Sequence, residues 1–202
     1  MIARRVGFAL VLLAVVIPGS VWAADDADPK SVAMAFYTAL GRGDGKAARE
    51  LSIAGPREGK WIDASAAMNG GFKHLYAVAL EKFGPDGAKR FAEKSPAEYS
   101  AELVERSPAR QQQDEAGIIV NEKTGAAIVL TRRDGKWRMD WTKGLKDKDI
   151  QPQTALYTRM ADALNGVAEG VRSGKYATAP DAERELKARF LKAVGSQPTT
   201  AP

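Results

Sequence analysis

The sequence predicts an α+β fold, because the spacing of its apolar residues changes twice along the chain. In the first half, apolar residues recur every three or four positions, as on one face of a helix. From Tyr99 they alternate with polar neighbours, and Asp134-Gly135 between two such runs is typical of a tight hairpin. Helical spacing returns beyond Gly144. We therefore expect N-terminal helices packed on an antiparallel sheet, followed by a C-terminal helical hairpin.

Two helices are predicted after residue 28. Asp28 provides an N-terminal cap and Pro29 suits the first helical position, so a helix is expected over residues 29–40. A glycine-rich turn ends it, and Asp44 caps a second, short helix. Residues 55–59, which contain two glycines and a proline, are expected to form a loop.

A long amphipathic helix is predicted over residues 61–83. The members of its apolar stripe lie three or four residues apart: Met68, Phe72, Leu75, Ala79 and Phe83. The sequence Asn69-Gly70-Gly71 interrupts the helical pattern, since each glycine inside a helix costs about 1 kcal/mol relative to alanine. We expect either a kink there or two helices in succession.

Strands are predicted from Tyr99 onward. Residues 99–103 alternate between apolar and polar, and residues 118–120 form a β-branched run. Between them, residues 107–115 contain a proline and three glutamines. This composition indicates an irregular connection or a poorly packed edge strand.

The turn at Asp134-Gly135 fixes the register of the strands that it joins. A two-residue type I′ turn places Leu130 opposite Met139 and Ile128 opposite Trp141. One face of the hairpin is then apolar and faces the core, and the other is mostly polar.

Two more helices are predicted from the apolar spacing over residues 152–174 and 178–195. We expect them to form a helical hairpin that packs on the same domain. The predicted organisation is therefore a main domain over residues 24–145, the hairpin over residues 146–195, and a disordered tail over residues 196–202.

The first 23 residues have the features of a secretory signal peptide. Arg4 and Arg5 precede a largely apolar run over residues 6–17, and small residues precede a cleavage position after Ala23. The run is shorter than the roughly 20 residues that a membrane helix needs. We expect cleavage after Ala23 and a periplasmic or secreted protein without a stable membrane anchor.

The composition excludes several classes of function. The chain has no cysteine, which excludes disulfides and thiol catalysis, and its single histidine excludes a two-histidine metal site within one chain. Loss of the signal peptide removes two arginines and no acidic residue, so the formal charge falls from +5 to +3. The remaining charges are interspersed, unlike the concentrated basic face of a nucleic-acid-binding protein. We expect no metal, no cofactor and no nucleic-acid partner.

His74 is the candidate for acid/base catalysis, because histidine exchanges protons readily near neutral pH and this one follows the Gly-Gly pair. The alternative is a surface or core-edge histidine. No carboxylate is paired with it by spacing in the sequence.

Three residues are candidates for binding. Trp61 and Trp137 offer flat rings for an apolar or sugar-like ligand, although Trp61 is also suited to anchor a helix start and Trp137 to shield the hairpin tip. Arg138 shares the polar face of the hairpin with Arg133 and Lys136, where an anion could bind. The alternative is a solvated face whose charges prevent aggregation of the sheet edge.

Two segments of the sequence carry a resemblance to a known family. DPKSVAMAFYTALGRGDGKAARELS (residues 28–52) and AAIVLTRRDGKWRMDW (residues 126–141) resemble the opening helices and closing strands of the nuclear transport factor 2-like superfamily. The second segment resembles the closing strands of the exported, mostly uncharacterised members. The resemblance covers residues 28–141 and implies a curved, cone-shaped sheet wrapped against helices. The C-terminal helical hairpin departs from the family pattern.

The resemblance implies two classes of function, because members of this superfamily either bind ligands and partners or catalyse isomerisation, dehydration or hydrolysis. The first expectation is an extracytoplasmic, non-catalytic binding or interaction module for a small apolar ligand or a protein partner. Its C-terminal helices would cover the sheet or pair with a second copy in a homodimer. The alternative is a small exported acid/base enzyme that uses the cone pocket and His74.

Overall fold

The computed structural model describes residues 28–144 and 147–195. The helices are α1 (Pro29–Gly41), α2 (Gly45–Glu50), α3 (Pro56–Ala88), α4 (Pro96–Arg106), α5 (Trp141–Gly144), α6 (Asp147–Arg172) and α7 (Ala179–Gly195). The strands are β1 (Ser52–Ile53), β2 (Ala109–Gln112), β3 (Glu115–Asn121), β4 (Ala126–Arg133) and β5 (Lys136–Asp140). The predicted signal peptide, the 145/146 boundary and the predicted tail lie outside the described residues.

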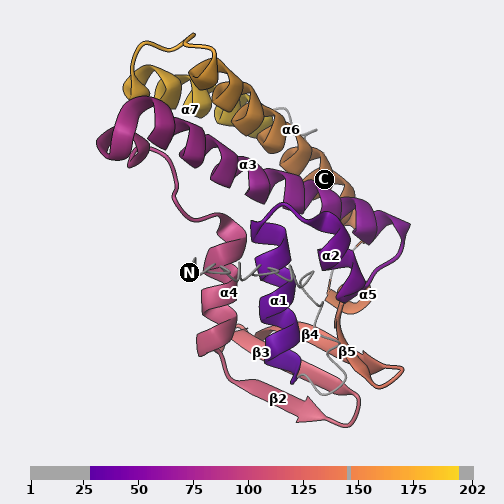
Figure 1. Ribbon diagram of the computed structural model, residues 1–202. Helices are drawn as coiled ribbons and strands as arrows, with labels where there is room; N and C mark the ends of the chain where they lie inside the picture. The colour runs from indigo at the N-terminus through magenta and orange to yellow at the C-terminus, as the bar shows by residue number, and fades with distance from the viewer. Residues whose placement is uncertain (1–27, 145–146, 196–202) are drawn as a thin grey trace, which may run out of the picture.

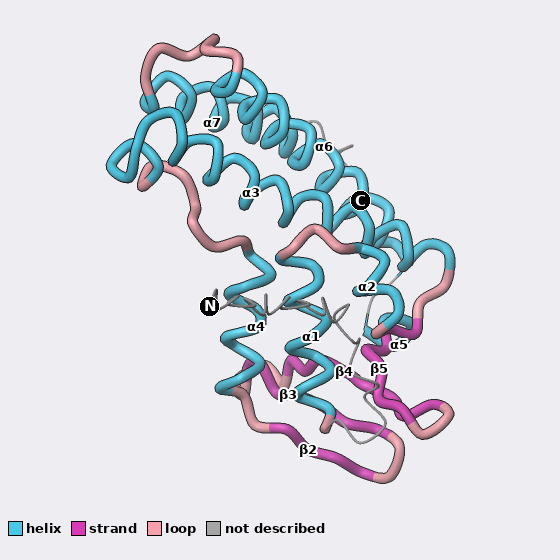
Figure 2. The backbone as a smooth tube through the Cα atoms, in the orientation of Figure 1, coloured by secondary structure: helices cyan, strands magenta, loops and turns pink. Residues whose placement is uncertain are grey.

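The molecule has two layers, as Figure 1 shows. Helices α3, α6 and α7 pack side by side in one layer, and the sheet with α1 and α4 forms the other. Figure 2 shows α1 and α4 standing between the sheet and α3, which crosses their ends. The α+β class expected from the sequence is confirmed, including the C-terminal pair of helices.

The sheet has the strand order β1-β5-β4-β3-β2. All neighbouring strands are antiparallel except β1, which pairs parallel to β5 and was not predicted. Strand β2 lies at the edge with every residue exposed, so the edge-strand alternative for this segment is confirmed.

The predicted hairpin is confirmed in its turn and register. Asp134 and Gly135 have φ angles of 53° and 78°, as a type I′ turn requires, and Leu130 pairs with Met139. The predicted pairing of Ile128 with Trp141 is wrong. Strand β5 ends at Asp140, and Trp141 begins α5.

The prediction of a strand over residues 99–103 is also wrong, because this segment belongs to α4. Pro96 occupies the first turn of the helix, and the Glu98 carboxylate accepts a hydrogen bond from the Ser95 backbone N–H at 2.8 Å. The buried residues of α4 are spaced by seven positions, as on one side of a helix. These start signals outweigh a short alternation of apolar residues.

The two N-terminal helices are confirmed, with their caps. The Asp28 carboxylate accepts from the Lys30 and Ser31 backbone N–H groups, and Asp44 accepts from that of Ala47. The prediction of a loop over residues 55–59 is wrong for residues 56–59, which form the start of α3. Gly55 is the N-cap of α3, and the following proline takes the first helical position.

The kink predicted at residues 69–71 is wrong. We call residues 69–71 of α3 the α3 crossing, because other elements meet the helix there. The helix runs through it and is interrupted only at Gly84, where φ is 71°. A Cβ atom on Gly70 would lie 3.0 Å from the Gly43 Cα atom, and one on Gly71 would lie 3.1 Å from the Leu164 Cβ atom. The glycines therefore let α3 approach its neighbours closely.

Asn69 links the α3 crossing to α4 by a hydrogen bond. Its buried side chain donates to the Ser65 carbonyl oxygen at 2.7 Å and accepts from the Ala97 backbone N–H at 2.8 Å. The second bond satisfies an N–H group in the first turn of α4, which has no partner within its own helix.

Helix α3 contributes to two hydrophobic clusters. Its first half contributes to a cluster that also includes α1, α4 and the inner face of the sheet, with Phe36, Ile62, Ile118, Leu130 and Met139 among its largest fully buried members. Its second half packs with α6 and α7 around Leu75, Val78, Leu164, Val167 and Val171. Helix α3 therefore buries apolar surface in both clusters.

The C-terminal helices differ from the prediction at their ends. Helix α6 begins at Asp147, so Pro152 lies within it rather than at its start. Val194, whose spacing from Leu186 and Phe190 is that of an apolar helix stripe, is 55% exposed on α7. The connection between the helices is held by Tyr176, whose buried ring lies directly over Gly170.

Two glycines of α6 give a matched test of this packing. Alanine gains about 1 kcal/mol over glycine in a helix interior. At Gly170 the added methyl group meets the buried Tyr176 ring, and overpacking of this kind costs about 1–3 kcal/mol. We expect Gly170→Ala to lower the free energy of unfolding in urea.

Gly166→Ala is the control, because its methyl group meets only the tip of the Arg189 side chain, which can move aside. We expect this variant to be as stable as the parent or up to about 1 kcal/mol more stable. Equal effects of the two substitutions would contradict the packing of Tyr176 on α6.

Candidate functional site

His74 lies on α3, half-buried, with both ring nitrogens in contact with α6. Its Nε2 atom lies 2.7 Å from an Arg172 guanidinium nitrogen, and its Nδ1 atom lies 3.4 Å from the Asn165 Oδ1 atom. A guanidinium only donates, so Nε2 accepts and the proton is on Nδ1. The acid/base hypothesis requires a carboxylate or tyrosine partner. Within the described residues, the hydrogen-bond partners of this ring are an amide and a guanidinium.

The tryptophans expected to bind a ligand lie in the core. Trp61 and Trp137 are 7% and 8% exposed. The Trp61 indole N–H donates to the Gln153 side-chain oxygen at 3.2 Å, which joins α3 to α6. These two rings therefore contribute buried apolar area rather than an open binding surface.

Arg138 lies on the opposite face of β5 from Trp137, because neighbouring residues of a strand point to opposite sides. Its guanidinium donates to the backbone carbonyl of Glu50, the last residue of α2. A carbonyl at the end of a helix lacks an intrahelical donor, and Arg138 supplies one. The structure thus does not bring the three predicted binding residues together.

An aromatic cluster that was not predicted as a unit joins the two layers. It consists of Phe36, Tyr37, Trp61, Trp141 and Tyr157. The Trp61 and Trp141 ring centroids are 4.8 Å apart, and the buried Trp141 indole N–H has no hydrogen-bond partner in the described part of the chain. Burial raises the pKa of Tyr37 to about 12 and also raises that of Tyr157.

Asp140 is a buried acid at the start of α5. Its carboxylate accepts from the Thr131 hydroxyl at 2.7 Å, and from the Thr142 hydroxyl and backbone N–H at 2.6 and 3.2 Å. Burial alone would raise its pKa, but these hydrogen bonds and the nearby Lys143 ammonium outweigh burial and lower the pKa below 3.8. The carboxylate is therefore ionised and serves as a helix cap.

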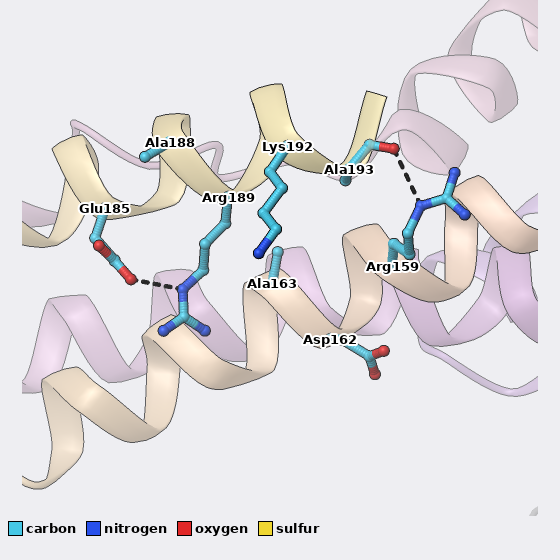
Figure 3. Close-up of a pocket in the computed structure, with 8 residues that line it drawn as sticks. All are labelled: Arg159, Asp162, Ala163, Glu185, Ala188, Arg189, Lys192 and Ala193. Atoms are coloured by element: carbon cyan, nitrogen blue, oxygen red, sulfur yellow. Dashed lines mark hydrogen bonds and ion pairs between the residues drawn. The ribbon is translucent and has the colours of Figure 1, made fainter. Parts of the chain in front are cut away.

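A surface hollow lies between α6 and α7, and we call it the α6–α7 groove (Figure 3). Its volume is about 540 Å³, which falls in the range of small-molecule sites. The charged residues that line it are Arg159, Asp162, Glu185, Arg189 and Lys192. Three small residues complete the lining: Ala163, Ala188 and Ala193.

The charged residues of the groove reach across from one helix to the other. Arg159 on α6 donates through Nε to the carbonyl oxygen of Ala193 on α7 at 3.0 Å. Arg189 on α7 donates through Nε to Glu185 at 2.8 Å, and its guanidinium extends toward α6 (Figure 3). The hydrogen bond from Arg189 lowers the pKa of the Glu185 carboxyl. Two half-buried arginines from different helices are thereby held in the groove.

Two smaller hollows offer less defined chemistry. One, of about 360 Å³, lies between α2 and the start of α3, where Arg49 and Asp63 form an ion pair. The other, of about 450 Å³, lies at the exposed edge strand β2. The groove was not predicted, because its side chains come from two helices whose relative register is set by tertiary packing.

Residues 28–144 and 147–195 contain no cluster of three or more acidic or histidine side chains suited to hold a metal ion. Over the same ranges, no helix has the length and apolar character required to cross a membrane. Comparison of the chain with family models, curated proteins and solved structures gives no match.

Substitution of Asp140 by asparagine tests its role through the pH dependence of stability. A carboxylate whose pKa is lowered by folding stabilises the protein above the unfolded-state value, near 3.8, and this contribution is lost as the pH falls through the lower folded-state value. We expect Asp140→Asn to cost about 2 kcal/mol at neutral pH, by loss of charge-assisted hydrogen bonds. The difference from the parent should shrink in acid.

Asp134→Asn is the control, because Asn-Gly forms the same type I′ turn as Asp-Gly. Its unfolding free energy should match that of the parent from neutral pH into acid. A cost of Asp140→Asn that persists unchanged in acid would contradict the role of the ionised carboxylate.

Proposed function

We propose that this protein is an exported, non-catalytic binding module, and that its ligand occupies the α6–α7 groove. The observation that carries this proposal is the groove itself, an open hollow of small-molecule size lined by charged side chains from two helices. Export is proposed from residues 1–23, which have the pattern of a signal peptide.

A likeness to the nuclear transport factor 2-like superfamily is part of the proposal. Its support is the order of elements, in which two capped helices joined by a Gly-Asp turn precede a hairpin that closes the strand region. The long helices α6 and α7 lie outside that pattern, and we place the binding role on these two helices.

The alternative of an acid/base enzyme has weaker support. His74 is held by Asn165 and Arg172, and the Asp140 carboxylate is held as the cap of α5. Each of these proton-exchanging groups already has a structural role. General acid/base catalysis instead needs a titratable group directed at a substrate, within hydrogen-bond reach.

A ligand screen tests the proposed function. We expect a small-molecule component of an extracytoplasmic extract to raise the melting temperature of residues 24–202, because a ligand of the native state stabilises it by about 2.7 kcal/mol at 100 times Kd. Backbone amide shifts in NMR spectra should then change around Ala163 and Ala188.

Ala188→Leu fills the groove with a larger side chain and should abolish this stabilisation. The control is Ala155→Leu, an exposed alanine of α6 that does not line the groove, and it should keep the effect. Absence of any stabilising component, amide shifts centred elsewhere, or chemical conversion of the ligand would contradict the proposal.

A further inference from the structure

We infer that the open edge of the sheet, strand β2, takes an extended acidic segment of a partner protein as an additional antiparallel strand. This inference goes beyond the proposed small-molecule site and concerns the other end of the molecule, as Figure 1 shows. It is carried by three features of the edge: its unpaired backbone groups, its accessibility and the charge beside it.

The hydrogen bonds between β2 and β3 show which backbone groups of β2 are already used. The Ile119 N–H donates to the Pro108 carbonyl oxygen at 3.0 Å, so these residues form a hydrogen-bonded pair at the start of the ladder. Hydrogen-bonded pairs alternate with non-hydrogen-bonded pairs along antiparallel strands. Arg110 and Gln112 therefore also direct their backbone groups to β3, whereas the residues between them direct theirs to the open side.

Ala109 and Gln111 are the residues with free backbone groups. Each has an N–H and a C=O directed away from β3, and none of these groups has a hydrogen-bond partner in the described part of the chain. An antiparallel strand laid beside β2 would exchange hydrogen bonds with both residues. Unpaired groups in this arrangement are the template on which proteins add a peptide strand to a sheet.

The edge at β2 is accessible and regular. All its residues are exposed, and the pairing of β2 with β3 has no register shift. Proline, which blocks many sheet edges, occurs before the strand and not within it. The other edge of the sheet differs, because β1 has only two residues and lies against α2 and α5. Strand β2 is therefore the edge that a partner can reach.

A hollow of about 450 Å³ lies beside this edge. Arg110, Gly117 and Val129 line it, and the register places these residues side by side across β2, β3 and β4. They alternate along their strands with the buried residues of β3 and β4, so they lie on the face of the sheet turned away from the core. Because Gly117 has no side chain, the space next to Arg110 is open.

The unpaired charge in this hollow is positive. Glu115, the acid that lines it, forms an ion pair with Lys143. Arg110 has no hydrogen-bond or ion-pair partner among the residues that the structure describes. Asp114 lies in the turn beyond β2 and does not line the hollow. A partner strand therefore meets a free guanidinium on this face of the sheet.

The geometry of strand pairing places one partner residue close to Arg110. Since β3 uses the backbone groups of Arg110, this residue would form a non-hydrogen-bonded pair with the added strand. In such pairs the Cα atoms are about 4.5 Å apart and the side chains lie closest. An aspartate or glutamate opposite Arg110 can accept from its guanidinium, which favours an acidic segment.

The test is a titration of residues 24–202 with an acetylated and amidated peptide, Thr-Val-Thr-Glu-Thr-Val-Thr, followed by amide NMR. One comparison peptide has lysine in place of glutamate. A second has N-methyl groups on the two threonines beside the glutamate, which removes the donors that would face Ala109 and Gln111. We expect the glutamate peptide to shift the amides of these two residues. The lysine peptide should bind about fivefold more weakly, and the N-methylated peptide should not bind.

Two substitutions of Gln111 locate the interaction on the backbone. Gln111→Pro removes an N–H at the open edge and no hydrogen bond to β3, so the fold is retained. Gln111→Ala is the control, because it keeps the N–H. We expect the proline variant to lose binding and the alanine variant to keep it. The N-methylated peptide makes the same test on the parent chain.

Two arginine variants test the charge. Arg110→Gln should bind the glutamate and lysine peptides equally. Arg133→Gln, at the far end of β4 on the same face, should keep the preference for glutamate.

Three peptide results would overturn the inference: no binding of the glutamate peptide, equal binding of the N-methylated peptide, or amide shifts centred in the α6–α7 groove. Self-association in analytical ultracentrifugation that Gln111→Pro abolishes would also overturn it, by showing that a second copy of the chain occupies the edge. The ligand screen of the α6–α7 groove is independent of these outcomes.

Discussion

The structure depends on the close approach of four elements at the α3 crossing. Over three residues, α3 contacts the start of α4 through Asn69, the turn after α1 through Gly70, and α6 through Gly71. Any side chain at the two glycine positions would separate elements that lie within van der Waals distance. The local helix propensity lost at these glycines is offset by the burial that the approach allows.

The crossing connects the two hydrophobic clusters and so links the fold to the candidate site. Ile62 and Ala66, before it, belong to the cluster that includes α1 and the sheet, whereas Leu75 and Val78, after it, belong to the cluster with α6 and α7. Helix α6 packs on α3, and α7 packs on α6. The contact between α3 and α6 therefore also fixes the position of α7 and of the groove between α6 and α7. The aromatic cluster reinforces this link, since Tyr157 of α6 lies against Trp61 of α3.

The features that could be predicted from the sequence are those determined by residues close to one another along the chain. The Asp28 and Asp44 caps, the Asp134-Gly135 turn and the strand register that it imposes are set by local backbone chemistry. One error arose where contacts between distant segments decide, because the glycines at residues 70–71 pack against other elements instead of breaking α3. The error at residues 99–103 was local, since the capping box of Ser95 and Glu98 outweighs the short apolar alternation that predicted a strand.

The candidate site was predicted less well, because contacts between distant segments form it. Trp61 and Trp137 were expected to bind a ligand, to anchor a helix start or to shield the hairpin tip, yet both are buried in the core. Neither sequence spacing nor composition could show that Arg138 would bond to the end of α2. The groove brings Arg159 beside Ala193, residues 34 positions apart, and nothing in either local sequence marks that pairing. His74 acquires its partners only through the register of α3 on α6.

Native-state hydrogen exchange in an Asn69→Ala variant tests whether both parts of the fold depend on the α3 crossing, with Gln151→Ala as the control for loss of an exposed amide side chain. Loss of the Asn69 side chain leaves the Ala97 N–H buried without its acceptor, at a cost of about 1–3 kcal/mol. We expect faster exchange at Ala97 and a matching loss of protection for the slowest amides of both β4 and α6, because both hydrophobic clusters include α3. Unchanged protection in α6, with loss confined to the first turn of α4, would contradict this dependence.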